Sequence, residues 1–369
     1  MRLEQIDILD FKNIREARLE FSPGVNCLLG LNGMGKSNLL EAIHFLSMAR
    51  PMQSMPESAL IRHGEPALMV KGMYVMDSGA EETVSCGIIR GKGKTLRRND
   101  KEYDRISEHI GRFPVVSVIP GDSELVSGGG EQRRRLLDMV ISQSDPSYLS
   151  RLIRYNKSLE SRNKMLRAGV NDRVLYEAVE AGLAETATAI HRARQQWTST
   201  IRPVFESYYK RISGGMETAS LSYKSVLNEK TMQEALDAER SRDLALGFTS
   251  AGIHRDDLLT RLDEWSMRRL GSQGQVKTFT IALRLAIFSY LKQTGGISAV
   301  LLLDDIFDKL DSTRVARIMN EVSQGEGFGQ IFITDTNREH LDETVAGIDP
   351  SRRRLFEVSD GEFRTISLP

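Results

Sequence analysis

Hydrophobic residues alternate with polar ones at the start of the chain, and this pattern predicts strands with one buried face. Apolar side chains recur at Leu3, Ile6 and Ile8, and a second alternating run covers residues 17–21. A period of two places side chains such as those of Ile6 and Ile8 on the same face of a strand. The apolar run at residues 25–29 does not alternate, which is typical of a short, fully buried strand.

After this strand, the apolar residues recur at the spacing of a helix. In residues 37–48 the side chains of Leu39, Leu40, Ile43 and Leu46 share one face, which predicts an amphipathic helix. The same reasoning predicts further strands at residues 68–76, 83–89, 115–119, 300–303 and 331–334, and further helices at 275–292 and 312–322. Strands that alternate with helices in this way indicate an α/β fold.

The pattern changes in the middle of the chain. Residues 123–242 are mainly helical in spacing, with long charged segments, and Pro203 is expected to kink or end the longest helix. Strand signals return afterwards. The chain is therefore predicted to consist of an α/β lobe formed by residues 1–121 and 245–369, with a helical lobe, residues 122–244, inserted between the two parts.

Composition narrows the class of protein. The chain has 369 residues, 40% hydrophobic and 27% charged, which is ordinary for a globular protein and excludes collagenous or disordered chains. Cys27 and Cys86 are the only cysteines and lie far apart, so neither a zinc site nor a disulfide framework is expected. The N-terminus lacks the apolar run of a signal peptide, and we expect a cytoplasmic protein.

A phosphate-binding loop follows the strand predicted at residues 25–29. The segment Gly30-Leu31-Asn32-Gly33-Met34-Gly35-Lys36-Ser37 fits the pattern G-x-x-x-x-G-K-[ST]. Its backbone N–H groups are expected to surround phosphate oxygens, with Lys36 at the β- and γ-phosphates and Ser37 on Mg²⁺. The residues expected to bind ATP here are Gly30, Leu31, Asn32, Gly33, Met34, Gly35, Lys36, Ser37 and Asn38.

Two acids end a later strand and complete the expected ATPase site. Asp304 and Asp305 follow the apolar run at residues 300–303. We expect Asp304 to help hold Mg²⁺ with Ser37, and Asp305 to polarise the attacking water. The alternative for Asp305 is a supporting role without base function. Lys36, Asp304 and Asp305 are the predicted catalytic residues.

A second candidate phosphate site opens the helix predicted at residues 275–292. Ser272, Gly274 and Gln275 lie at its start, where a hydroxyl and backbone N–H groups can face an anion. One phosphate loop already serves the nucleotide, so this segment is interpreted as closing on ATP held by another subunit. In isolation, the alternative is a simple helix N-cap turn. The order of phosphate loop, helical insertion, Ser-x-Gly-Gln segment and acid-ended strand is that of ABC-type ATPases.

The motifs together resemble those of the bacterial RecF family, recombination and repair ATPases with an SMC-like head and no long coiled coil. The resemblance runs essentially end to end. Besides the motifs above, it includes Phe11-Lys12-Asn13, the segments 133–138 and 252–258, and Leu310-Asp311, where ABC proteins place the D-loop. It implies an ABC-type ATPase head with a phosphate-loop α/β lobe and an inserted, mainly helical lobe.

The resemblance also implies function. It implies an ATP-dependent homodimer that binds single-stranded or gapped DNA, with Lys12 near the phosphates and ATP and Mg²⁺ as cofactors. Slow, DNA-stimulated hydrolysis would release the DNA. RecR and RecO are the implied protein partners, in loading recombinase and in SOS induction.

Several positions depart from the patterns of related ATPases. Many ABC proteins carry a switch histidine where this chain has Thr334-Asp335-Thr336, and ABC transporters carry glutamate at the position of Asp305. Lys12 stands where SMC-type heads often carry arginine, and Ile253 stands where the RecF family usually carries proline. The region after the strand at residues 115–119, where a Q-loop glutamine is expected, offers Asp122 instead.

Charge is balanced overall but segregated locally. Lysine plus arginine and aspartate plus glutamate each total 50, so a uniformly basic nucleic-acid binder is excluded. Residues 130–170 hold nine basic and four acidic side chains, a net charge of about +5. A basic run is more often a solvated face than a DNA contact, and Tyr148 and Tyr155 are more often core than base-stacking residues. We therefore expect DNA binding to depend on nucleotide, because ATP would join two basic faces.

The main alternative is an ABC-type nucleotide-binding subunit that serves a partner other than DNA. Such a subunit would retain the switch histidine and a clear Q-loop glutamine. An SMC protein proper would need a long coiled coil between its halves, for which the chain has no room.

Overall fold

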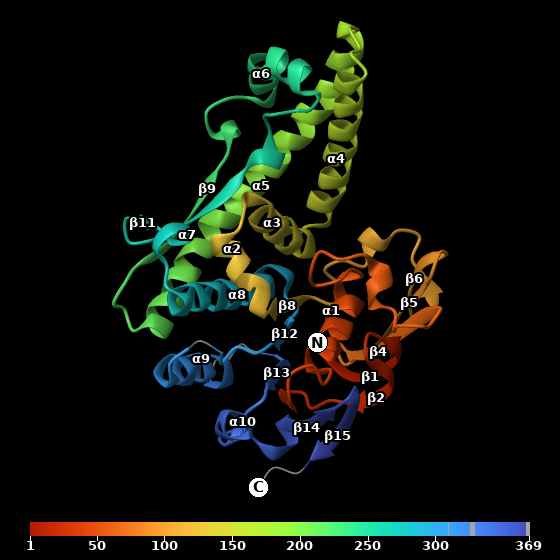
Figure 1. Cartoon of the computed structure of the whole chain (residues 1–369), viewed down its shortest axis with the longest axis vertical. Coiled ribbons are helices and arrows are strands. Elements are labelled where there is room, and N and C mark those ends of the chain that lie inside the picture. Colours follow the sequence, from red (N-terminus) through yellow and green to blue (C-terminus); the bar gives the residue numbers. More distant parts are fainter. Residues whose placement is uncertain (309, 325–328, 367–369) are drawn as a thin grey trace. The chain divides into compact units, whose positions relative to one another are not determined.

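The computed structural model describes residues 1–308, 310–324 and 329–366 (Figure 1). Contacts divide the chain into two compact units. The first comprises Met1–Asp122 and Thr280–Pro369, and the second comprises Ser123–Phe279. The first predicted boundary differs from this division by one residue. The second, at 244–245, is wrong, because the structure keeps residues 245–279 in the inserted unit.

A six-stranded sheet forms the centre of the first unit. Its order is β15-β14-β3-β13-β12-β8, and all neighbours are parallel except β14 and β15. The strands are β3 (Val25–Leu29), β8 (Val115–Val118), β12 (Val300–Leu303), β13 (Ile331–Asp335), β14 (Arg353–Ser359) and β15 (Glu362–Ile366). All residues of β8 and β12 are buried, as expected for parallel strands covered on both faces, and Ser117 is their one polar residue. The predicted strands 25–29, 115–119, 300–303 and 331–334 are confirmed to within a residue.

The second sheet of this unit is antiparallel, in the order β2-β1-β4-β5-β6-β7. Its strands are β1 (Arg2–Phe11), β2 (Ile14–Glu20), β4 (Ala67–Val75), β5 (Glu81–Ile89), β6 (Gly93–Arg98) and β7 (Lys101–Glu102). Leu3, Ile6 and Ile8 are all buried, as the pattern predicts, but Leu3 and Ile6 are an odd number of residues apart. A shift in the register of β1 with β4 between Leu3 and Gln5 allows both to be buried. One face of the sheet therefore contributes to the core.

Among the residues that the structure describes, four α-helices accompany these sheets. They are α1 (Lys36–Met48), α8 (Gln273–Gly295), α9 (Ser312–Gln324) and α10 (Arg338–Val345), and α8 begins in the other unit. Helix α1 contacts β1, β4 and β5 of one sheet and β8 and β13 of the other. Leu39, Leu40, Ile43 and Leu46 are all buried there, so the predicted apolar face of α1 is part of the core.

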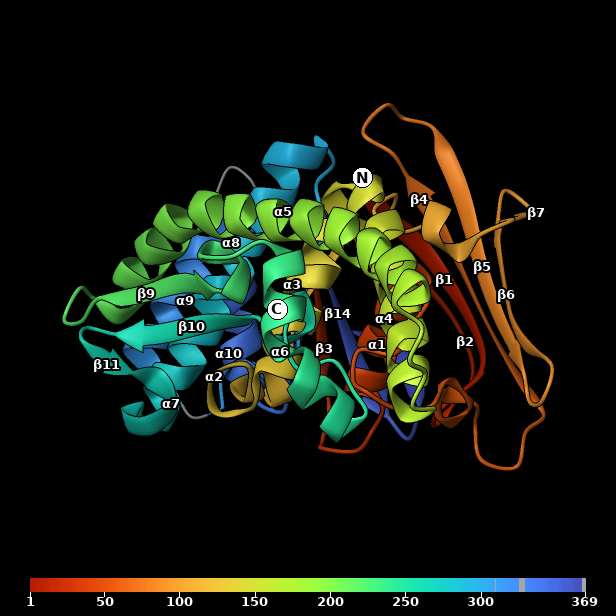
Figure 2. The same cartoon turned by 90° about the horizontal axis from the view of Figure 1, so that it is seen from above.

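The second unit is helical with a small sheet (Figure 2). Its helices are α2 (Glu124–Ser127), α3 (Gly130–Ser144), α4 (Pro146–Arg167), α5 (Arg173–Ser213), α6 (Met232–Leu246) and α7 (Met267–Leu270). Its strands are β9 (Ala219–Lys224), β10 (Asp257–Leu262) and β11 (Trp265–Ser266). β10 pairs with both other strands in antiparallel register, which explains why residues beyond 244 belong to this unit.

Helix α5 excludes one of the two outcomes predicted for Pro203, an end of the helix. It runs through Pro203 without ending there, for 41 residues in all. Ile201 and Phe205, on either side of the proline, are fully buried, so packing outweighs the loss of one backbone hydrogen bond.

Short 3-10 helices connect these elements. They are η1 (Glu57–Leu60), η2 (Ile106–Glu108), η3 (Pro120–Ser123), η4 (Val226–Asn228), η5 (Ile253–Arg255) and η6 (Pro350–Arg352). Among the described residues, no helix combines the length and the apolar character needed to cross a membrane.

Candidate functional site

The predicted phosphate loop connects β3 to α1, and its glycines adopt backbone conformations that other residues avoid. Gly33 and Gly35 have φ of 82° and 113°. A Cβ atom at Gly35 would also lie 2.9 Å from Asn13 Oδ1. Glycine is therefore required at Gly35 both by conformation and by space. Helix α1 begins at Lys36, so the N–H groups of its first turn, which have no partner within the helix, lie next to this loop.

Lys36 is held inside the loop. Its Nζ donates to the carbonyl oxygens of Gly30 at 2.5 Å and Leu31 at 2.9 Å, and the residue is 7% exposed. Burial lowers the pKa of the Lys36 ammonium, and the nearby carboxylates of Asp305 and Asp304 oppose this effect. A mainly buried cation bonded only to loop carbonyls among the described residues is positioned to meet an anionic ligand.

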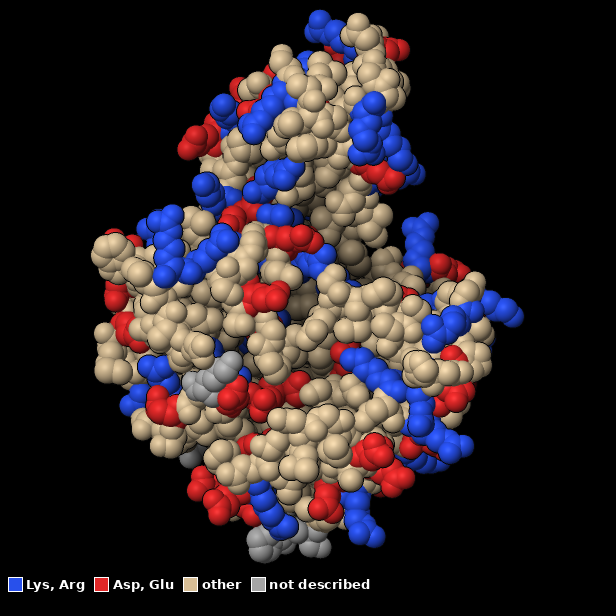
Figure 3. Space-filling view, viewed as in Figure 1, with Lys and Arg blue, Asp and Glu red and all other residues tan. Residues whose placement is uncertain are grey.

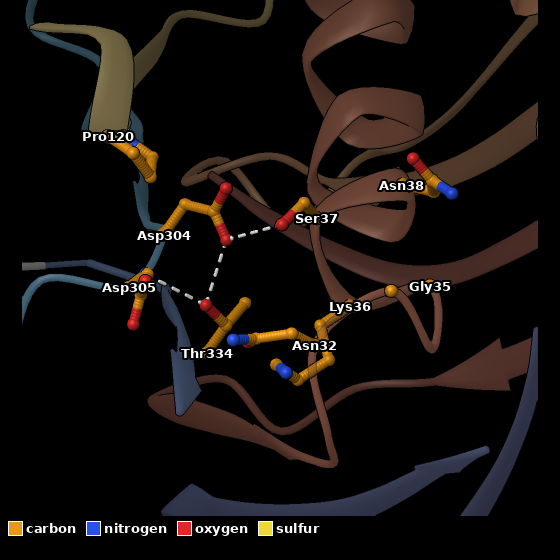
Figure 4. Close-up of a pocket in the computed structure, with 10 residues that line it drawn as sticks. Asn32, Gly35, Lys36, Ser37, Asn38, Pro120, Asp304, Asp305 and Thr334 are labelled. Atoms are coloured by element: carbon orange, nitrogen blue, oxygen red, sulfur yellow. Dashed lines mark hydrogen bonds between the residues drawn. The ribbon is translucent and has the colours of Figure 1, made fainter. Parts of the chain in front are cut away.

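Asp304 lies opposite the loop, at the end of β12 (Figure 4). Its Oδ1 accepts hydrogen bonds from Ser37 Oγ at 2.8 Å and from Thr334 Oγ1 at 2.8 Å. Burial raises the pKa of Asp304, whereas the two hydroxyl bonds act to lower it. The structure thus brings together Ser37 and Asp304, the two predicted Mg²⁺ ligands, although they are 267 positions apart.

Asp305 is the next residue, and its backbone is left-handed with φ of 50°. Its N–H donates to Thr334 Oγ1 at 2.9 Å. In Figure 4 the Asp305 carboxylate points in a different direction from that of Asp304. The two acids are therefore placed differently, one against Ser37 and one at the edge of the pocket.

These residues line one pocket with a volume of about 140 Å³. The lining residues are Asn32, Gly33, Gly35, Lys36, Ser37, Asn38, Pro120, Asp304, Asp305 and Thr334. A lysine, loop N–H groups and hydroxyl and carboxylate oxygens are the groups that a phosphate chain with Mg²⁺ requires. Eight of the ten were predicted as site residues. Pro120 and Thr334 were not, although the resemblance had placed Thr334 at the switch position.

Lys12 lies outside this lining. Its Nζ donates to Glu41 Oε2 at 3.0 Å, and Glu41 also accepts from Met52 N–H at 2.8 Å. The adjacent Asn13 accepts from Asn38 Nδ2 at 2.7 Å and so contacts the end of the loop. Glu41 is buried on α1 and was not singled out from the sequence. The phosphate contact of Lys12 stays a prediction.

The segment Ser272–Gln275 is in the second unit, at the start of α8. Ser272 N–H donates to Gln275 Oε1 at 2.8 Å, and Gln275 N–H donates to Ser272 Oγ at 3.3 Å. Gln275 Nε2 also donates to Glu217 at 2.5 Å. The segment is thus a reciprocal N-cap with Ser272 exposed to solvent. The cap predicted as the alternative is present, and the roles of Ser272, Gly274 and Gln275 at a nucleotide stay predictions.

Asp122, which the sequence offered in place of a Q-loop glutamine, is paired with an arginine. Arg284 donates to it through Nε at 3.0 Å and Nη2 at 2.6 Å, and both side chains are buried. Asp122 also accepts from Ile119 N–H at 3.2 Å. Its carboxylate joins η3 to α8 instead of facing the pocket.

The basic stretch at residues 130–170 divides into buried and exposed members. Arg133 forms a two-bond pair with Asp257, and Arg162 is fully buried against Glu180 and Asp243. The exposed basic residues are Arg135, Arg154, Lys157, Lys164 and Arg167. Four of these lie on α4, where Figure 3 shows Lys and Arg side chains at the surface.

The tyrosines of the stretch belong to the core. Tyr148 is fully buried and Tyr155 is 1% exposed, which confirms the interpretation that neither is a base-stacking residue. The count of +5 for the stretch therefore overstates the charge that a ligand would meet.

Residues 2–353 match the family described as RecF/RecN/SMC N terminal domain. The DNA replication and repair protein RecF of Porphyromonas gingivalis is 46% identical over 363 residues, covering 98% of this chain and 99% of that protein. The protein of the same name from Parabacteroides distasonis is 45% identical over 366 residues, covering 99% of this chain and 100% of that protein.

Solved structures are similar along the whole chain. The recombination mediator protein RecF-ATPrS in the RecFOR pathway matches with a TM-score of 0.87 and 29% identity, covering 99% of this chain and 98% of that one. The Smc head bound to the C-winged helix domain of ScpA matches with a TM-score of 0.58 and 16% identity, covering 100% of this chain and 98% of that one. The second likeness concerns the fold alone. Together they confirm the predicted α/β fold of an ABC-type ATPase head.

Proposed function

We infer the function of this chain from one premise: it belongs to the RecF family of DNA replication and repair proteins. We propose that it is an ATP-dependent DNA-binding protein of recombinational repair and replication-fork maintenance. The observation that carries the proposal is the convergence of Lys36, Ser37, Asp304 and Asp305 on one pocket. The relative whose solved structure is described as RecF-ATPrS supports ATP as the nucleotide.

Each side chain of the pocket has a separate role in the proposed slow hydrolysis of ATP. Lys36 and the N–H groups at the start of α1 bind and orient the phosphate chain. Ser37 and Asp304 would hold Mg²⁺, which would supply positive charge beside the phosphate oxygens. Asp305 orients the attacking water and accepts its proton. Its side chain is one methylene shorter than glutamate, which suits slow turnover.

A second subunit completes the proposed site. Ser272 is exposed at the N-terminus of α8, where helix N–H groups favour an anion. We place ATP between the Lys36 loop of one subunit and the Ser272 segment of another, so that ATP closes a homodimer on DNA and hydrolysis reopens it. By family membership, RecR and RecO are the proposed partners in recombinase loading and SOS induction.

Ser272→Arg tests the dimer. The added side chain should block closure, so ATP-dependent dimers disappear while ATP binding survives. Analytical ultracentrifugation with and without ATP measures the first property, and titration with fluorescent ATP measures the second. Ser199→Arg, on the exposed surface of α5, is the matched control and should leave the dimer intact. Dimers that persist in Ser272→Arg would rule out the sandwich.

The exposed cations of α4 are the proposed DNA contacts. Lys157→Ala combined with Arg167→Ala should weaken binding to single-stranded, double-stranded and gapped DNA in the presence of ATP. Each lost phosphate contact should reduce the slope of log affinity against log salt by about 0.7–0.9. The measurement is fluorescence anisotropy across salt concentrations.

Arg90→Ala with Lys92→Ala, near the exposed turn between β5 and β6, makes the same change in net charge and is the control for the α4 variant. An equal loss in both variants would assign the effect to overall charge. DNA affinity that is the same with and without ATP would contradict nucleotide-dependent binding. ATP-dependent dimers that bind none of the DNAs would favour an ABC-type subunit with another partner.

A further inference from the structure

Thr334 is a buried threonine that lines the pocket at the position where many ABC proteins carry the switch histidine. It lies on β13, between β3 and β12, and is fully buried. The parallel register pairs Leu303 with Ile333, so the next residues along the two strands, Asp304 and Thr334, are neighbours. The hydroxyl is therefore directed at the acids that end β12.

One oxygen atom serves both acids. Thr334 Oγ1 donates its hydrogen to Asp304 Oδ1 at 2.8 Å and accepts the N–H of Asp305 at 2.9 Å. A hydroxyl has one donor and two acceptor positions, so it can make both bonds at once. It links a side-chain oxygen of the first acid to the backbone of the second (Figure 4).

The backbone at Asp305 explains why such a link matters. Its φ of 50° lies in the left-handed region, where residues other than glycine are uncommon and need support from their surroundings. The bond from Asp305 N–H to Thr334 fixes the peptide unit at which the chain turns away from β12. The direction of the Asp305 carboxylate depends on that turn.

The other side of the link is fixed by the phosphate loop. Ser37 Oγ also donates to Asp304 Oδ1, at 2.8 Å, so hydroxyls from α1 and β13 hold the same carboxylate oxygen. Among the described residues, none donates to Asp304 Oδ2, which leaves that oxygen available for a Mg²⁺ ion or its water. Thr334 thus shares with Ser37 the task of orienting the carboxylate.

We propose that Thr334 is a positioning residue for ATP hydrolysis, which sets the placement of Asp305 relative to Asp304 through a single hydroxyl. The proposal rests on the proposed ATPase function. It assigns to this position on β13 a role inside its own subunit, directed at the two acids instead of at the nucleotide. Loss of the hydroxyl should lower the rate of ATP hydrolysis without weakening the binding of the phosphates by Lys36.

The test compares Thr334→Val with Thr334→Ser. Valine keeps the β-branched shape and removes both hydrogen bonds, whereas serine keeps the hydroxyl. We expect kcat to fall by about 10- to 100-fold in Thr334→Val, because small displacements of catalytic groups have effects of that size. The KM for ATP should stay within about twofold, and Thr334→Ser should recover most of the rate. Thr365→Val makes the same exchange at an exposed threonine on β15, in the same unit, and should change nothing.

Turnover is calculated per nucleotide-binding site, determined by titration with fluorescent ATP, so that unfolded protein does not imitate a slow enzyme. Thr334→Ala is the second hydroxyl-free variant if the valine variant does not fold. Wild-type turnover in either variant, or a serine variant as slow as the valine one, would overturn the positioning role. Wild-type protein that does not hydrolyse ATP would instead overturn the proposed function.

Discussion

Lys36→Ala is expected to weaken ATP binding by about a thousandfold. The Lys36 ammonium lies inside the phosphate loop, with two carbonyl oxygens as its hydrogen-bond partners. Phosphate oxygens would provide at least two charge-assisted bonds, each worth about 1.5–3 kcal/mol. A total of about 4 kcal/mol corresponds to about a thousandfold change in Kd. Isothermal titration calorimetry with ATP measures the difference.

Two measurements separate this effect from a general loss of structure. Thermal unfolding of Lys36→Ala should change little, because the lysine bonds only to loop carbonyls among the described residues. Lys101→Ala removes an exposed lysine of β7 in the same unit and should bind ATP like the wild type. ATP affinity of Lys36→Ala within threefold of wild type would contradict the assignment of the phosphate loop.

The phosphate loop could be predicted from the sequence because its parts are contiguous. The glycines, Lys36 and Ser37 lie in eight consecutive residues between a strand and a helix. The pairing of Ser37 with Asp304 was predicted because each belongs to a motif of known chemistry. The RecF family was identified for the same reason, from ordered motifs, and its relatives confirm it.

Contacts between distant segments could not be predicted in the same way. The hydroxyl of Thr334 reaches the two acids only because β13 lies beside β12 in the sheet, which no local pattern states. The partner of Lys12 is Glu41, on the buried side of α1, where hydrophobic spacing alone predicts no acid. In both cases, the order of strands and the packing of a helix decide the contact.

Local propensity also misled where packing was stronger. Pro203 allows a helix to end, yet α5 continues because its apolar side chains are buried on both sides of the proline. β9 and β10 are separated by α6, and their antiparallel pairing moves residues 245–279 into the inserted unit. Sequence patterns describe each strand but not its partner.

Arg162 was counted among the basic residues of the stretch 130–170, but it is buried among acidic side chains of neighbouring helices. Its removal is expected to have a large effect on stability. Arg162 Nε donates to Glu180 Oε1 at 2.8 Å, and Nη1 donates to Asp243 Oδ2 at 2.6 Å and Thr249 Oγ1 at 2.9 Å. The side chains of Arg162, Glu180 and Asp243 are at most 1% exposed. This group joins α4, α5 and α6, the three helices from which its members come.

Arg162→Leu is expected to lower the free energy of unfolding by about 3–5 kcal/mol, because it leaves the buried Asp243 carboxylate without its cation and leaves Glu180 with Arg240 alone. Arg154→Leu, on the same helix, is the matched control. Its pair with Glu185 has side chains that are 60% and 68% exposed, and such surface pairs contribute about 0–1 kcal/mol. Chemical denaturation followed by circular dichroism compares the two variants.

The same pair of variants distinguishes a structural arginine from a DNA contact. If Arg162 stabilises α4 from inside, Asp243→Asn should recover part of the stability lost in Arg162→Leu, since it removes the carboxylate charge that Arg162 compensates. If Arg162 instead contacted DNA, Arg162→Leu would remain as stable as Arg154→Leu and lose DNA affinity. That result would contradict the burial of the triad. It would also mean that Arg162 belongs to the basic surface of α4, as the sequence alone suggested. The comparison therefore determines whether Arg162 adds to the charge that DNA meets on α4.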